Sequence, residues 1–502
     1  MTSKILLTTL NSRYMHSAFG LRYLYANLGV LQSDASIVEF TIQQRPIDIV
    51  EALLKHDPKI IGFSLYIWNI TETSLVINML KQIAPQVVLV GGGPEISFAD
   101  DLPDVSAQLD HIVTGPGESS FRDLCKNLLS GLNSSAKIIA GVSEPLAQLN
   151  LPYDYYNEDD IRNRLIYVEA SRGCPFKCEF CLSSLDKTAL PFELDLFLQA
   201  MDKLYLRGAR NFKFIDRTFN LKVSSSVAIL EFFLARMDEE LYLHFEVIPD
   251  NLPEKLKQVL ARFPANQLQF EIGVQTFDPV IQQTISRKQN NQKTRENLRW
   301  LREHTGAHIH ADLIFGLPGD SLQNFADSFN QLAALNPQEI QLGILKRLRG
   351  APINRHTELY ELRYNPASPY NILSTRDISF ADMQRVNRFA RFWDMIANSG
   401  RFAATLPLIL GDDPFARFLV LSDKLYEKAG GSWKISLRRL FALLHAVTTG
   451  DLGIDDDICQ MALATDFQHS GEKGTLLLEK NGPKNPGRGG TANKRQKQHQ
   501  RA

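Results

Sequence analysis

Three cysteines in the segment SRGCPFKCEFCLSS are the residues of this sequence most suited to chemistry. Cys174, Cys178 and Cys181 stand at the spacing C-x3-C-x2-C. Three thiolates at this spacing can ligate three irons of a four-iron cluster and leave the fourth iron without a cysteine ligand. The fourth iron is then open to another ligand, and we expect the chemistry of the protein to take place there.

A structural zinc site is the alternative interpretation of these cysteines. Such a site usually has four ligands in two pairs, for example C-x2-C together with a second C-x2-C or with H-x3-H. The sequence has no second pair, because the two remaining cysteines, Cys125 and Cys459, are isolated and far away along the chain. The pattern therefore favours an iron–sulfur cluster over a zinc site.

The motif resembles the signature of the radical S-adenosylmethionine (SAM) superfamily, in which an aromatic residue, here Phe180, precedes the third cysteine. In that family the open iron binds the amino and carboxylate groups of SAM, and reductive cleavage of SAM produces a 5′-deoxyadenosyl radical. The resemblance implies a [4Fe–4S] cluster and SAM as cofactors. It also implies an electron donor such as flavodoxin or ferredoxin.

The composition is typical of a globular protein with several domains. The 502 residues include 55 Lys and Arg against 56 Asp and Glu, so bulk charge predicts affinity neither for nucleic acid nor for an anionic membrane. We find no signal peptide and no apolar run of about 18 residues that would cross a membrane. Clustered cysteines in such a chain suit metal binding in a reducing compartment. We therefore expect a cytoplasmic protein.

Residues 1–145 alternate short apolar runs with amphipathic segments of helical period. Strands are expected at 4–10, 37–42, 60–66, 87–90 and 111–114, and helices at 20–31, 47–55, 72–83 and 120–129. Strands and helices that alternate in this way predict an α/β fold with a doubly wound parallel sheet, covered by helices on both faces. Ligands of such a sheet bind beyond the carboxyl ends of its strands.

Glycine-rich loops follow several of these strands, and the patterns GGGPEIS and TGPGESSF are the most distinctive. They resemble the cobalamin-binding domain that precedes the radical domain in one large subgroup of the superfamily. None of the loops is a G-x-G-x-x-G motif or a P-loop, which disfavours a nicotinamide cofactor or a nucleoside triphosphate. The resemblance implies cobalamin as a further cofactor and places around it Asn11, Gly20, Ser64, Gly91, Gly92, Gly93, Pro94, Glu95, Gly115, Gly117 and Glu118.

His16 is the candidate for an axial ligand of the cobalt. Cobalamin domains that ligate cobalt through histidine carry D-x-H-x-x-G after the first strand, whereas this sequence reads YMHSAFG. The aspartate is missing and the glycine comes one position late. We therefore expect His16 to be a loop or capping residue, and the lower face of cobalamin to lack a histidine.

Residues 146–164 are polar and rich in tyrosine, and a linker is expected there. Strands and helices alternate again in 165–350, which predicts a partial (β/α)6 barrel with its active residues at the carboxyl ends of the strands. The cysteine loop directly follows the first of these strands, so the cluster belongs at that end of the barrel. The strands are expected at 165–170, 212–215, 244–248, 268–274, 308–315 and 339–345.

Polar residues and glycines stand where these barrel strands end. Similar positions in the radical SAM family contact the methionine part, the ribose and the adenine of SAM. A single buried acid or glutamine is more often a structural hydrogen-bonding residue, so this assignment depends on the residues acting together. The resemblance implies Phe180, Asp216, Glu246, Gln275, Arg287, Asp312, Gly316 and Pro318 as SAM-binding residues.

The remaining residues are expected to form a small helical domain over 351–470 and a disordered basic tail over 471–502. Ser379 is suited to cap a long amphipathic helix of about seven turns. The domain resembles a C-terminal extension of cobalamin-type radical SAM proteins. The tail is rich in Gly, Pro, Lys, Asn and Gln, which do not build a core.

These features predict a cobalamin-dependent radical SAM methyltransferase that acts on an unactivated carbon of a small-molecule substrate. A radical cyclase or rearrangement enzyme, similar to the anaerobic Mg-protoporphyrin monomethyl ester cyclase, is the alternative. Enzymes of tRNA methylthiolation carry a second cysteine triad in the N-terminal domain, where this sequence has only Cys125. A non-catalytic cluster-bearing sensor or nucleic-acid-binding protein has only the basic tail in its favour.

Overall fold

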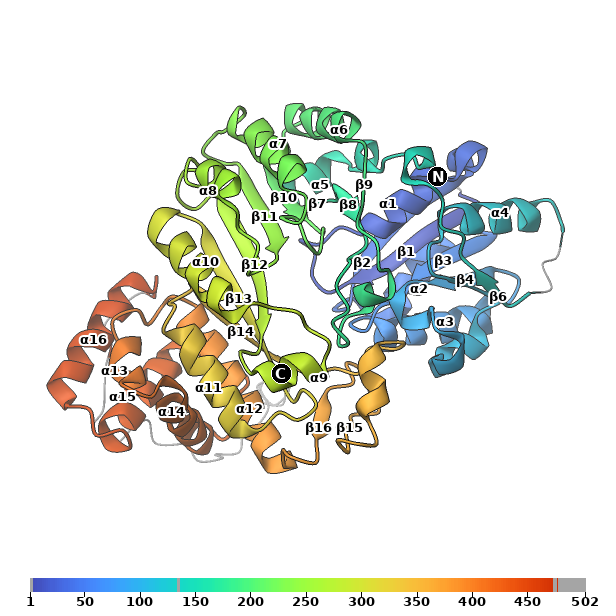
Figure 1. The fold of residues 1–502 in the computed structure, drawn as a ribbon. Coiled ribbons are helices and arrows are strands. Elements are labelled where there is room, and N and C mark those ends of the chain that lie inside the picture. Colours follow the sequence, from blue (N-terminus) through green and yellow to red (C-terminus); the bar gives the residue numbers. More distant parts are fainter. Residues whose placement is uncertain (1–2, 133–135, 473–475, 477–502) are drawn as a thin grey trace, which may run out of the picture. The chain divides into compact units, whose positions relative to one another are not determined.

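A computed structural model describes residues 3–132, 136–472 and 476, and Figure 1 shows the fold. The chain divides into two compact units, with the boundary between Met383 and Gln384. Of the tail that we expect to be disordered, all but residues 471, 472 and 476 lie outside the described residues. No helix within the described ranges is long and apolar enough to cross a membrane.

A six-stranded sheet of parallel strands begins the first unit, in the order β2-β1-β3-β4-β5-β6. The parallel sheet and the first five strands confirm the expectation from the sequence. The sixth strand was not predicted, because its three residues are partly or fully exposed and form no apolar run of useful length. The strands are β1 (Ile5–Asn11), β2 (Ala35–Thr41), β3 (Ile60–Ser64), β4 (Val88–Gly92), β5 (His111–Thr114) and β6 (Ile138–Ala140).

Helices cover both faces of this sheet, as Figure 1 shows. On one face, α2 (Pro46–Leu54) and α3 (Ile70–Ile83) pack over a buried core. On the other face, α1 (Phe19–Ala26) and α4 (Glu118–Leu129) pack over a second core. All seven residues of β1 are buried, as expected for a strand between two helical layers. The doubly wound arrangement is therefore confirmed.

The order of the strands reverses at β1, which pairs with β2 on one side and with β3 on the other. At such a reversal the chain leaves β1 and β3 in opposite directions, and a crevice opens at the carboxyl ends of the two strands. Asn11 and Ser64 are the last residues of these strands. Two of the residues expected around cobalamin therefore lie at the reversal point.

The segment 146–164, where we expect a linker, is folded. It contains two 3-10 turns, Leu146–Gln148 and Tyr153–Tyr155, and the helix α5 (Glu158–Asn163). Tyr153 and Tyr156 are buried, and their hydroxyls donate hydrogen bonds to backbone carbonyl oxygens of the segment that follows. The tyrosines that make this stretch look polar in the sequence are thus core residues whose hydroxyls are satisfied by the backbone.

A second six-stranded parallel sheet has the order β14-β13-β12-β11-β10-β7 and forms the partial barrel. Each strand pairs with the previous long strand of the chain, so the connections are βα crossovers. Two short antiparallel strands, β8 (Ser171–Arg172) and β9 (Leu190–Pro191), enclose the cysteine loop. The barrel strands are β7 (Ile166–Val168), β10 (Asn211–Phe214), β11 (Tyr242–Val247), β12 (Leu268–Gln275), β13 (His308–Phe315) and β14 (Glu339–Ile344).

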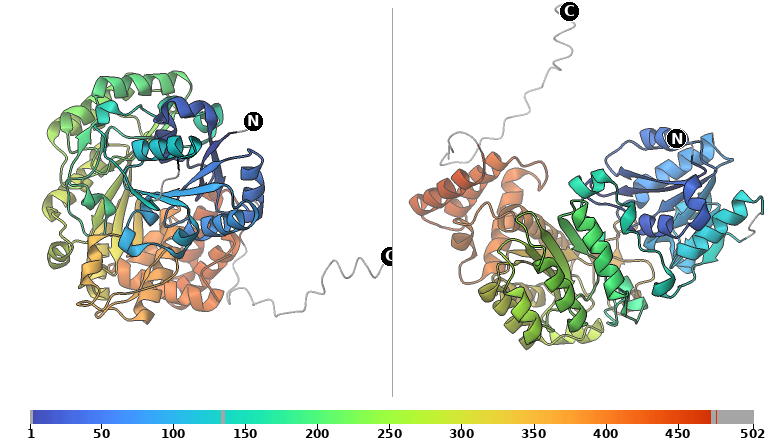
Figure 2. Two further views of the ribbon diagram at one scale, coloured as in Figure 1. Left: turned by 90° about the vertical axis from the view of Figure 1, so that its right-hand side faces the viewer. Right: turned by 90° about the horizontal axis from the view of Figure 1, so that it is seen from above.

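Five long or medium helices cover the outside of this sheet, as the view from above in Figure 2 shows. They agree with the helices that the sequence predicts at 193–206, 225–236, 254–263, 294–304 and 322–335. A short additional helix, α9 (Pro279–Thr284), follows β12 and was not predicted, since six residues are too few for a helical period. The outer helices are α6 (Leu194–Leu206), α7 (Val223–Leu234), α8 (Glu254–Leu260), α10 (Asn291–His304) and α11 (Leu322–Ala333).

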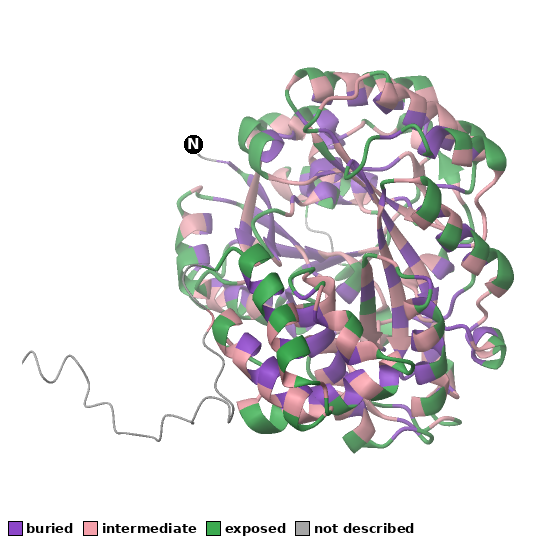
Figure 3. Cartoon of the chain, turned by 90° about the vertical axis from the view of Figure 1, so that its left-hand side faces the viewer, coloured by how far each residue is buried: buried purple, intermediate pink, exposed green. Residues whose placement is uncertain are grey.

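Residues of the barrel strands alternate between buried and partly exposed positions, strictly so in β12 and β13. The buried set, such as Phe270 and Phe315, packs beneath the helices. The other set, such as Glu271 and Asp312, lines the inside of the barrel. Figure 3 shows the buried residues gathered in the strands and the exposed ones on the outer surfaces of the helices. Polar side chains can therefore lie on the inner surface of the barrel.

A small hairpin of β15 (Arg363–Tyr364) and β16 (Ile372–Ser374) precedes α12 (Phe380–Trp393). Ser379 accepts a hydrogen bond from the backbone N–H of Asp382, as expected for the cap of this helix. The expected length of seven turns was wrong, because a π-helical turn follows at Asp394–Asn398 and Gly400 then takes φ +67°. The second unit also holds α13 (Leu406–Leu410), α14 (Pro414–Ala429), α15 (Leu437–Gly450) and α16 (Asp456–His469).

Candidate active site

The three cysteines lie together on one wall of a cavity inside the barrel. This cysteine cavity has a volume of about 260 Å³. Burial raises the pKa of the Cys174 thiol, and the neighbouring thiols of Cys181 and Cys178 raise it further. The thiols are therefore close enough to interact electrostatically.

Two residues outside the motif shape the base of the cysteine loop. Gly173 has φ +96°, and a Cβ there would lie 2.4 Å from the carbonyl oxygen of Thr188, so no other residue fits. Asp216, at the end of β10, accepts hydrogen bonds from the N–H of Ala170 at 2.9 Å and from Ser171 Oγ at 2.6 Å. Burial raises the pKa of Asp216 to about 7. The structure thus places Asp216 under the loop rather than on the cavity wall.

Five of the residues that the sequence suggests for SAM line the cysteine cavity together with the cysteines. They are Phe180, Glu246, Gln275, Arg287 and Asp312. Three others lie away from it, namely Asp216, Gly316 and Pro318. Gly316 takes φ +91°, and a Cβ there would meet the side chains of Ile372 and Met383, so it serves packing.

An irregularity at the end of β12 directs Gln275 into the cavity. The pairing with β13 slips between Gly273 and Gln275, and Gln275 takes φ +68°. Arg287 follows α9 and turns back toward this point, where its guanidinium donates to the carbonyl oxygen of Gly273 and lies 3.5 Å from Cys178 Sγ. One cation is thereby held next to a thiol and to the amide of Gln275.

Charged side chains cross the inside of the barrel in pairs. Arg217 donates to both carboxylate oxygens of Glu246 at 3.0 Å. Glu271 lies 3.1 Å from His244 Nε2 and 3.3 Å from Lys213 Nζ. Burial alone would raise the pKa of Glu271, but His244 and Lys213 outweigh it and lower the pKa to about 2. Glu271 is therefore an anion over the whole physiological range.

Asp312 has the opposite electrostatic environment. Burial raises its pKa well above the ordinary value, and the neighbouring carboxylates of Glu271 and Glu246 raise it further. The side chain of His310 lies 3.4 Å from Asp312, beyond strong hydrogen-bond distance. The pKa values of two carboxyl groups on adjacent strands, Glu271 and Asp312, are thus shifted in opposite directions.

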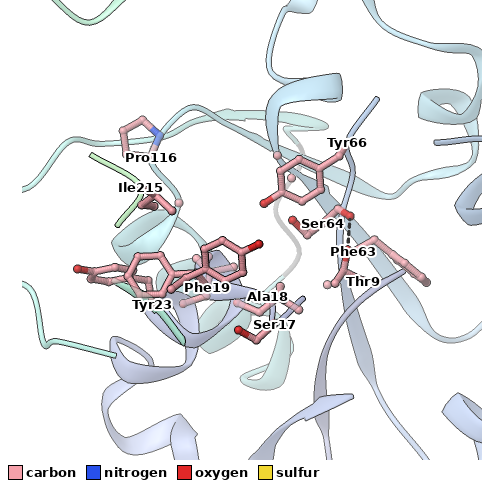
Figure 4. A pocket seen from close by; sticks show the side chains of 18 of the residues that line it. Thr9, Ser17, Ala18, Phe19, Tyr23, Phe63, Ser64, Tyr66, Pro116 and Ile215 are labelled. Carbon is pink, nitrogen blue, oxygen red and sulfur yellow. Dashed lines mark hydrogen bonds between the residues drawn. The ribbon is translucent and has the colours of Figure 1, made fainter. Parts of the chain in front are cut away.

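A larger cavity of about 720 Å³ lies at the carboxyl ends of the strands of the first sheet. Figure 4 shows part of this sheet cavity, with Ser64 and Tyr66 on one side and Ile215 of the barrel on another. Thr9 Oγ1 donates to the carbonyl oxygen of Ser64 at 3.0 Å and ties β1 to β3 at its floor. The residues expected around cobalamin that line it are Asn11, Gly20, Ser64, Gly91, Gly92, Gly93, Gly115, Gly117 and Glu118.

Two residues expected around cobalamin, Pro94 and Glu95, lie outside this lining. The carboxylate of Glu95 is buried and lies 2.9 Å from Arg349 Nε. It also accepts a hydrogen bond from the hydroxyl of Tyr370 at 2.7 Å. Glu95 therefore ties the loop after β4 to the segment that follows the barrel.

Glycines make the edge of the sheet cavity a surface of exposed backbone. Gly93 takes φ +103°, and a Cβ there would lie 2.6 Å from the carbonyl oxygen of Leu65. Gly115 takes φ +67° and has nothing within 4 Å of the position of a Cβ. A wide ligand can therefore approach the backbone at this edge without meeting side chains.

His16 lines the sheet cavity, but one of its ring nitrogens is already engaged. Nδ1 lies 2.7 Å from the hydroxyl of Tyr167 on β7. Burial lowers the pKa of His16, and the positive charge of Lys213 lowers it further. Tyr66, stacked on Trp68 with ring centroids 4.2 Å apart, lines the same cavity.

Three stretches of the chain match known families. Residues 5–125 match the B12 binding domain, residues 168–332 match the radical SAM superfamily, and residues 358–488 match a protein family of unknown function, DUF4080. The chain is an enzyme that contains a B12-binding domain followed by a radical SAM domain. The radical SAM domain implies a [4Fe–4S] cluster and SAM, and the B12-binding domain implies cobalamin.

Similar proteins include three methyltransferases, two of them found by sequence and one by structure. An uncharacterized methyltransferase of Pyrococcus horikoshii, PH0819, is 26% identical over 60% of this chain and 70% of its own length. The cobalamin-dependent radical SAM methyltransferase TokK of Streptomyces tokunonensis is 24% identical over 62% of this chain, which spans about half (51%) of TokK. The structure of the methyltransferase TsrM from Kitasatospora setae, with cobalamin and [4Fe–4S] cluster bound, matches 73% of this chain and 81% of TsrM at 17% identity, with a TM-score of 0.58.

The residues of this radical SAM enzyme fit the cofactors that its domains imply. Within the described ranges, no three side chains of His, Cys, Asp or Glu are grouped closely enough to hold a single metal ion. Three thiols on one wall of an open cavity fit the ligand set of a four-iron cluster. The broad, backbone-lined sheet cavity fits a large flat ligand such as cobalamin.

Sequence reasoning missed several charged residues of this enzyme that line the cavities. Glu271 lines the cysteine cavity, and Lys213, Glu169 and Arg172 line the sheet cavity. The signal for Glu271 was present, since it lies four residues before Gln275 on β12 and period-two alternation puts both on one face. For the others, the sequence alone carries no sign that they face a second domain.

Proposed function

We propose that this enzyme is a cobalamin-dependent methyltransferase that transfers a methyl group to an unactivated carbon of a small-molecule substrate. The observation that carries the proposal is the wall common to both cavities. Arg217 and Glu246 line the sheet cavity and also line the cysteine cavity. A ligand at the edge of the first sheet and a ligand at the cysteines would therefore be neighbours.

A substrate held between the two ligands would be within reach of both. When bound, the cluster and SAM supply a radical that removes hydrogen from carbon, and cobalamin supplies the methyl group. The contribution of the protein is to align the groups and to exclude water. The names of the two similar methyltransferases support methyl transfer here as well.

Within this proposal the residues divide into three groups. Cys174, Cys178 and Cys181 ligate the cluster. Phe180, Gln275, Arg287 and Asp312 surround SAM. The glycines at the carboxyl edge of the first sheet support cobalamin. The electrons come from a reducing protein such as flavodoxin or ferredoxin.

The lower face of cobalamin is proposed to lack a histidine ligand. His16 is the histidine that lines the sheet cavity among the described residues, and because Tyr167 engages its Nδ1, only its Nε2 would be available to cobalt. Its sequence context also departs from the D-x-H-x-x-G pattern. A cobalt without a nitrogen ligand below is expected to give the visible spectrum of base-off cobalamin.

The test is to reconstitute the protein anaerobically and titrate it with cobalamin, following the visible spectrum and co-elution on a sizing column. We expect one cobalamin per chain with a base-off spectrum, formation of 5′-deoxyadenosine on reduction, and transfer of label from methyl-labelled SAM to the bound cobalamin. SAM cleavage without cobalamin binding would refute the proposal and favour a radical cyclase or rearrangement enzyme.

A further inference from the structure

Glu179 lies next to Cys178 in the cysteine loop and is only 4% exposed. Its carboxylate is nevertheless fully engaged. Arg355 donates to both oxygens, from Nε at 2.9 Å and from Nη2 at 2.6 Å. His356 Nε2 lies 2.8 Å from Oε2, and Ser286 Oγ donates to Oε1 at 2.5 Å. A side chain between two cluster ligands thus receives hydrogen bonds from two other parts of the chain.

The backbone of Glu179 is held by the same two parts. Its N–H donates to the carbonyl oxygen of Ile285 at 3.0 Å, and its carbonyl oxygen accepts from the N–H of Ile353 at 2.9 Å. Ile285 directly follows α9 inside the barrel region, whereas Ile353 belongs to the 3-10 turn Pro352–His356 after the barrel. The segment between Cys178 and Cys181 is therefore held by its neighbours on both sides.

The charges at this point are balanced. Glu179 contributes a buried negative charge beside the cysteines, and the bidentate ion pair with Arg355 supplies a positive charge. Arg355 itself is 64% exposed, so the pair joins the surface of the protein to the interior of the loop. The reduction potential of an iron–sulfur cluster depends on net charge and hydrogen bonding around it. Removing either partner would change the net charge next to the cluster ligands by one unit, although His356 still contacts Glu179 when Arg355 is removed.

We propose that Glu179, Arg355 and His356 form a clamp that positions the cluster-binding loop and sets the reduction potential of the cluster. The proposal rests on the proposed function only in taking the three cysteines as the cluster ligands. It assigns a positioning role to the turn Pro352–His356, which lies outside the stretch that matches the radical SAM superfamily, residues 168–332.

The clamp predicts opposite shifts of the cluster potential in two variants. Arg355→Gln removes the bidentate positive charge from Glu179, leaves its carboxylate with the contacts to His356 and Ser286, and is expected to lower the midpoint potential. Glu179→Gln leaves Arg355 unpaired and is expected to raise it, and the double variant is expected to lie close to wild type. The measurement is a redox titration of the full chain, reconstituted with iron and sulfide without cobalamin and followed by the electron paramagnetic resonance of the reduced cluster.

Arg45→Gln is the matched control, because Arg45 also forms a bidentate pair, with Asp48, at an exposed site. Its midpoint potential should equal that of wild type. Shifts of the two test variants in the same direction, or no shift in either, would show a merely structural contact and overturn the proposal. Cobalamin is absent from this experiment, so its outcome is independent of whether methyl transfer occurs.

A second measurement keeps the proposal testable if the variants bind less iron. Lys177 is exposed within the loop and is a site for trypsin. In the full chain without iron, cleavage after Lys177 is expected on the order of tenfold faster in Arg355→Gln and Glu179→Gln than in wild type, because the loop opens more often. Unchanged cleavage at Lys177 in the two variants would overturn the clamp. A wild-type protein that binds no cluster would refute the premise that the three cysteines are cluster ligands.

Discussion

The two cavities of this protein are built in different ways. The sheet cavity has an edge of backbone, made by Gly91, Gly92, Gly93, Gly115 and Gly117. The cysteine cavity is lined by thiols and by charged side chains from successive barrel strands, such as Glu246, Glu271 and Asp312. The sheet cavity can accommodate a wide ligand because glycines leave its edge without side chains. The cysteine cavity instead recognises a small polar ligand through side chains of defined charge.

The physical reason lies in what covers each sheet. Helices bury both faces of the first sheet, so its strands are apolar and only the loops at its carboxyl edge are free to bind a ligand. The barrel sheet is covered on its outside alone. Polar residues can therefore occupy its inner face, as Glu271 and Gln275 do on β12 and His310 and Asp312 do on β13.

The largest expected effect abolishes the chemistry of the cysteine cavity and leaves ligand binding in the sheet cavity unchanged. Cys174→Ala removes a cluster ligand and is expected to abolish formation of 5′-deoxyadenosine, while the affinity for cobalamin stays unchanged because the sheet cavity does not involve Cys174. Product analysis by chromatography and a cobalamin titration of the same sample check both parts. Cys125→Ala is the control, because Cys125 lies in the core of the first unit and its loss should leave the cluster intact. Persistent SAM cleavage in Cys174→Ala would refute the mechanism.

The next effect concerns the wall that both cavities share. Arg217→Gln leaves Glu246 without its partner at the barrel mouth, and we expect the rate of 5′-deoxyadenosine formation to fall by roughly 10-fold to 100-fold. Arg217→Gln/Glu246→Gln should recover part of this loss, since neither charge is then unpaired. Rates of all three variants, Glu246→Gln included, form a double-mutant cycle. Additive losses would mean that the pair does not act as a unit.

A smaller effect should be confined to the sheet cavity. Gly93→Ala forces a Cβ against the carbonyl oxygen of Leu65 at a positive φ, which costs about 1–3 kcal/mol. We expect the dissociation constant for cobalamin to rise on the order of tenfold, with SAM cleavage unaffected. Gly131→Ala is the control, because Gly131 also has a positive φ but open space around it. Equal effects of both substitutions would point to backbone strain rather than to the shape of the cavity.

The smallest effect is a pH dependence of stability at the base of the cysteine loop. The pKa of Asp216 is raised to about 7 from its ordinary value of 3.8. Folding favours the protonated form of Asp216. The contribution of this carboxyl to the free energy of unfolding is therefore fully present below about pH 4 and is lost as the pH rises through 7. Between pH 5 and 7 the free energy of unfolding should fall by about 1 kcal/mol per pH unit more in wild type than in Asp216→Asn. Denaturant melts at several pH values test this, and parallel curves would contradict it.

The architecture was largely predictable from the sequence. Alternating apolar runs and helical periods indicated both parallel sheets, and the expected strands lie within a few residues of the observed ones. Elements without such a period were missed, namely β6 and α9. The segment 146–164 looked like a linker because tyrosine is counted as polar, whereas Tyr153 and Tyr156 bury their rings and satisfy their hydroxyls with the backbone.

The site was predictable only in part, because a position after a strand does not tell where a side chain points. Asp216 and Glu246 both come at the ends of barrel strands, yet Asp216 turns under the cysteine loop and Glu246 faces both cavities. Glu95 stands in a glycine-rich loop, yet it pairs with Arg349, more than 250 residues later in the chain. Pairings at this separation leave no periodic signal.

The sequence by itself determined the spacing of Cys174, Cys178 and Cys181, the glycines after the first strands and the order of the two sheets, since these depend on local period and on residue type. The tertiary structure alone decided that Arg217 and Glu246 form a wall common to both cavities. It also decided that Arg355 and His356 close on Glu179. Such contacts depend on how distant segments pack, and burial of their charges becomes favourable only once every partner is in place.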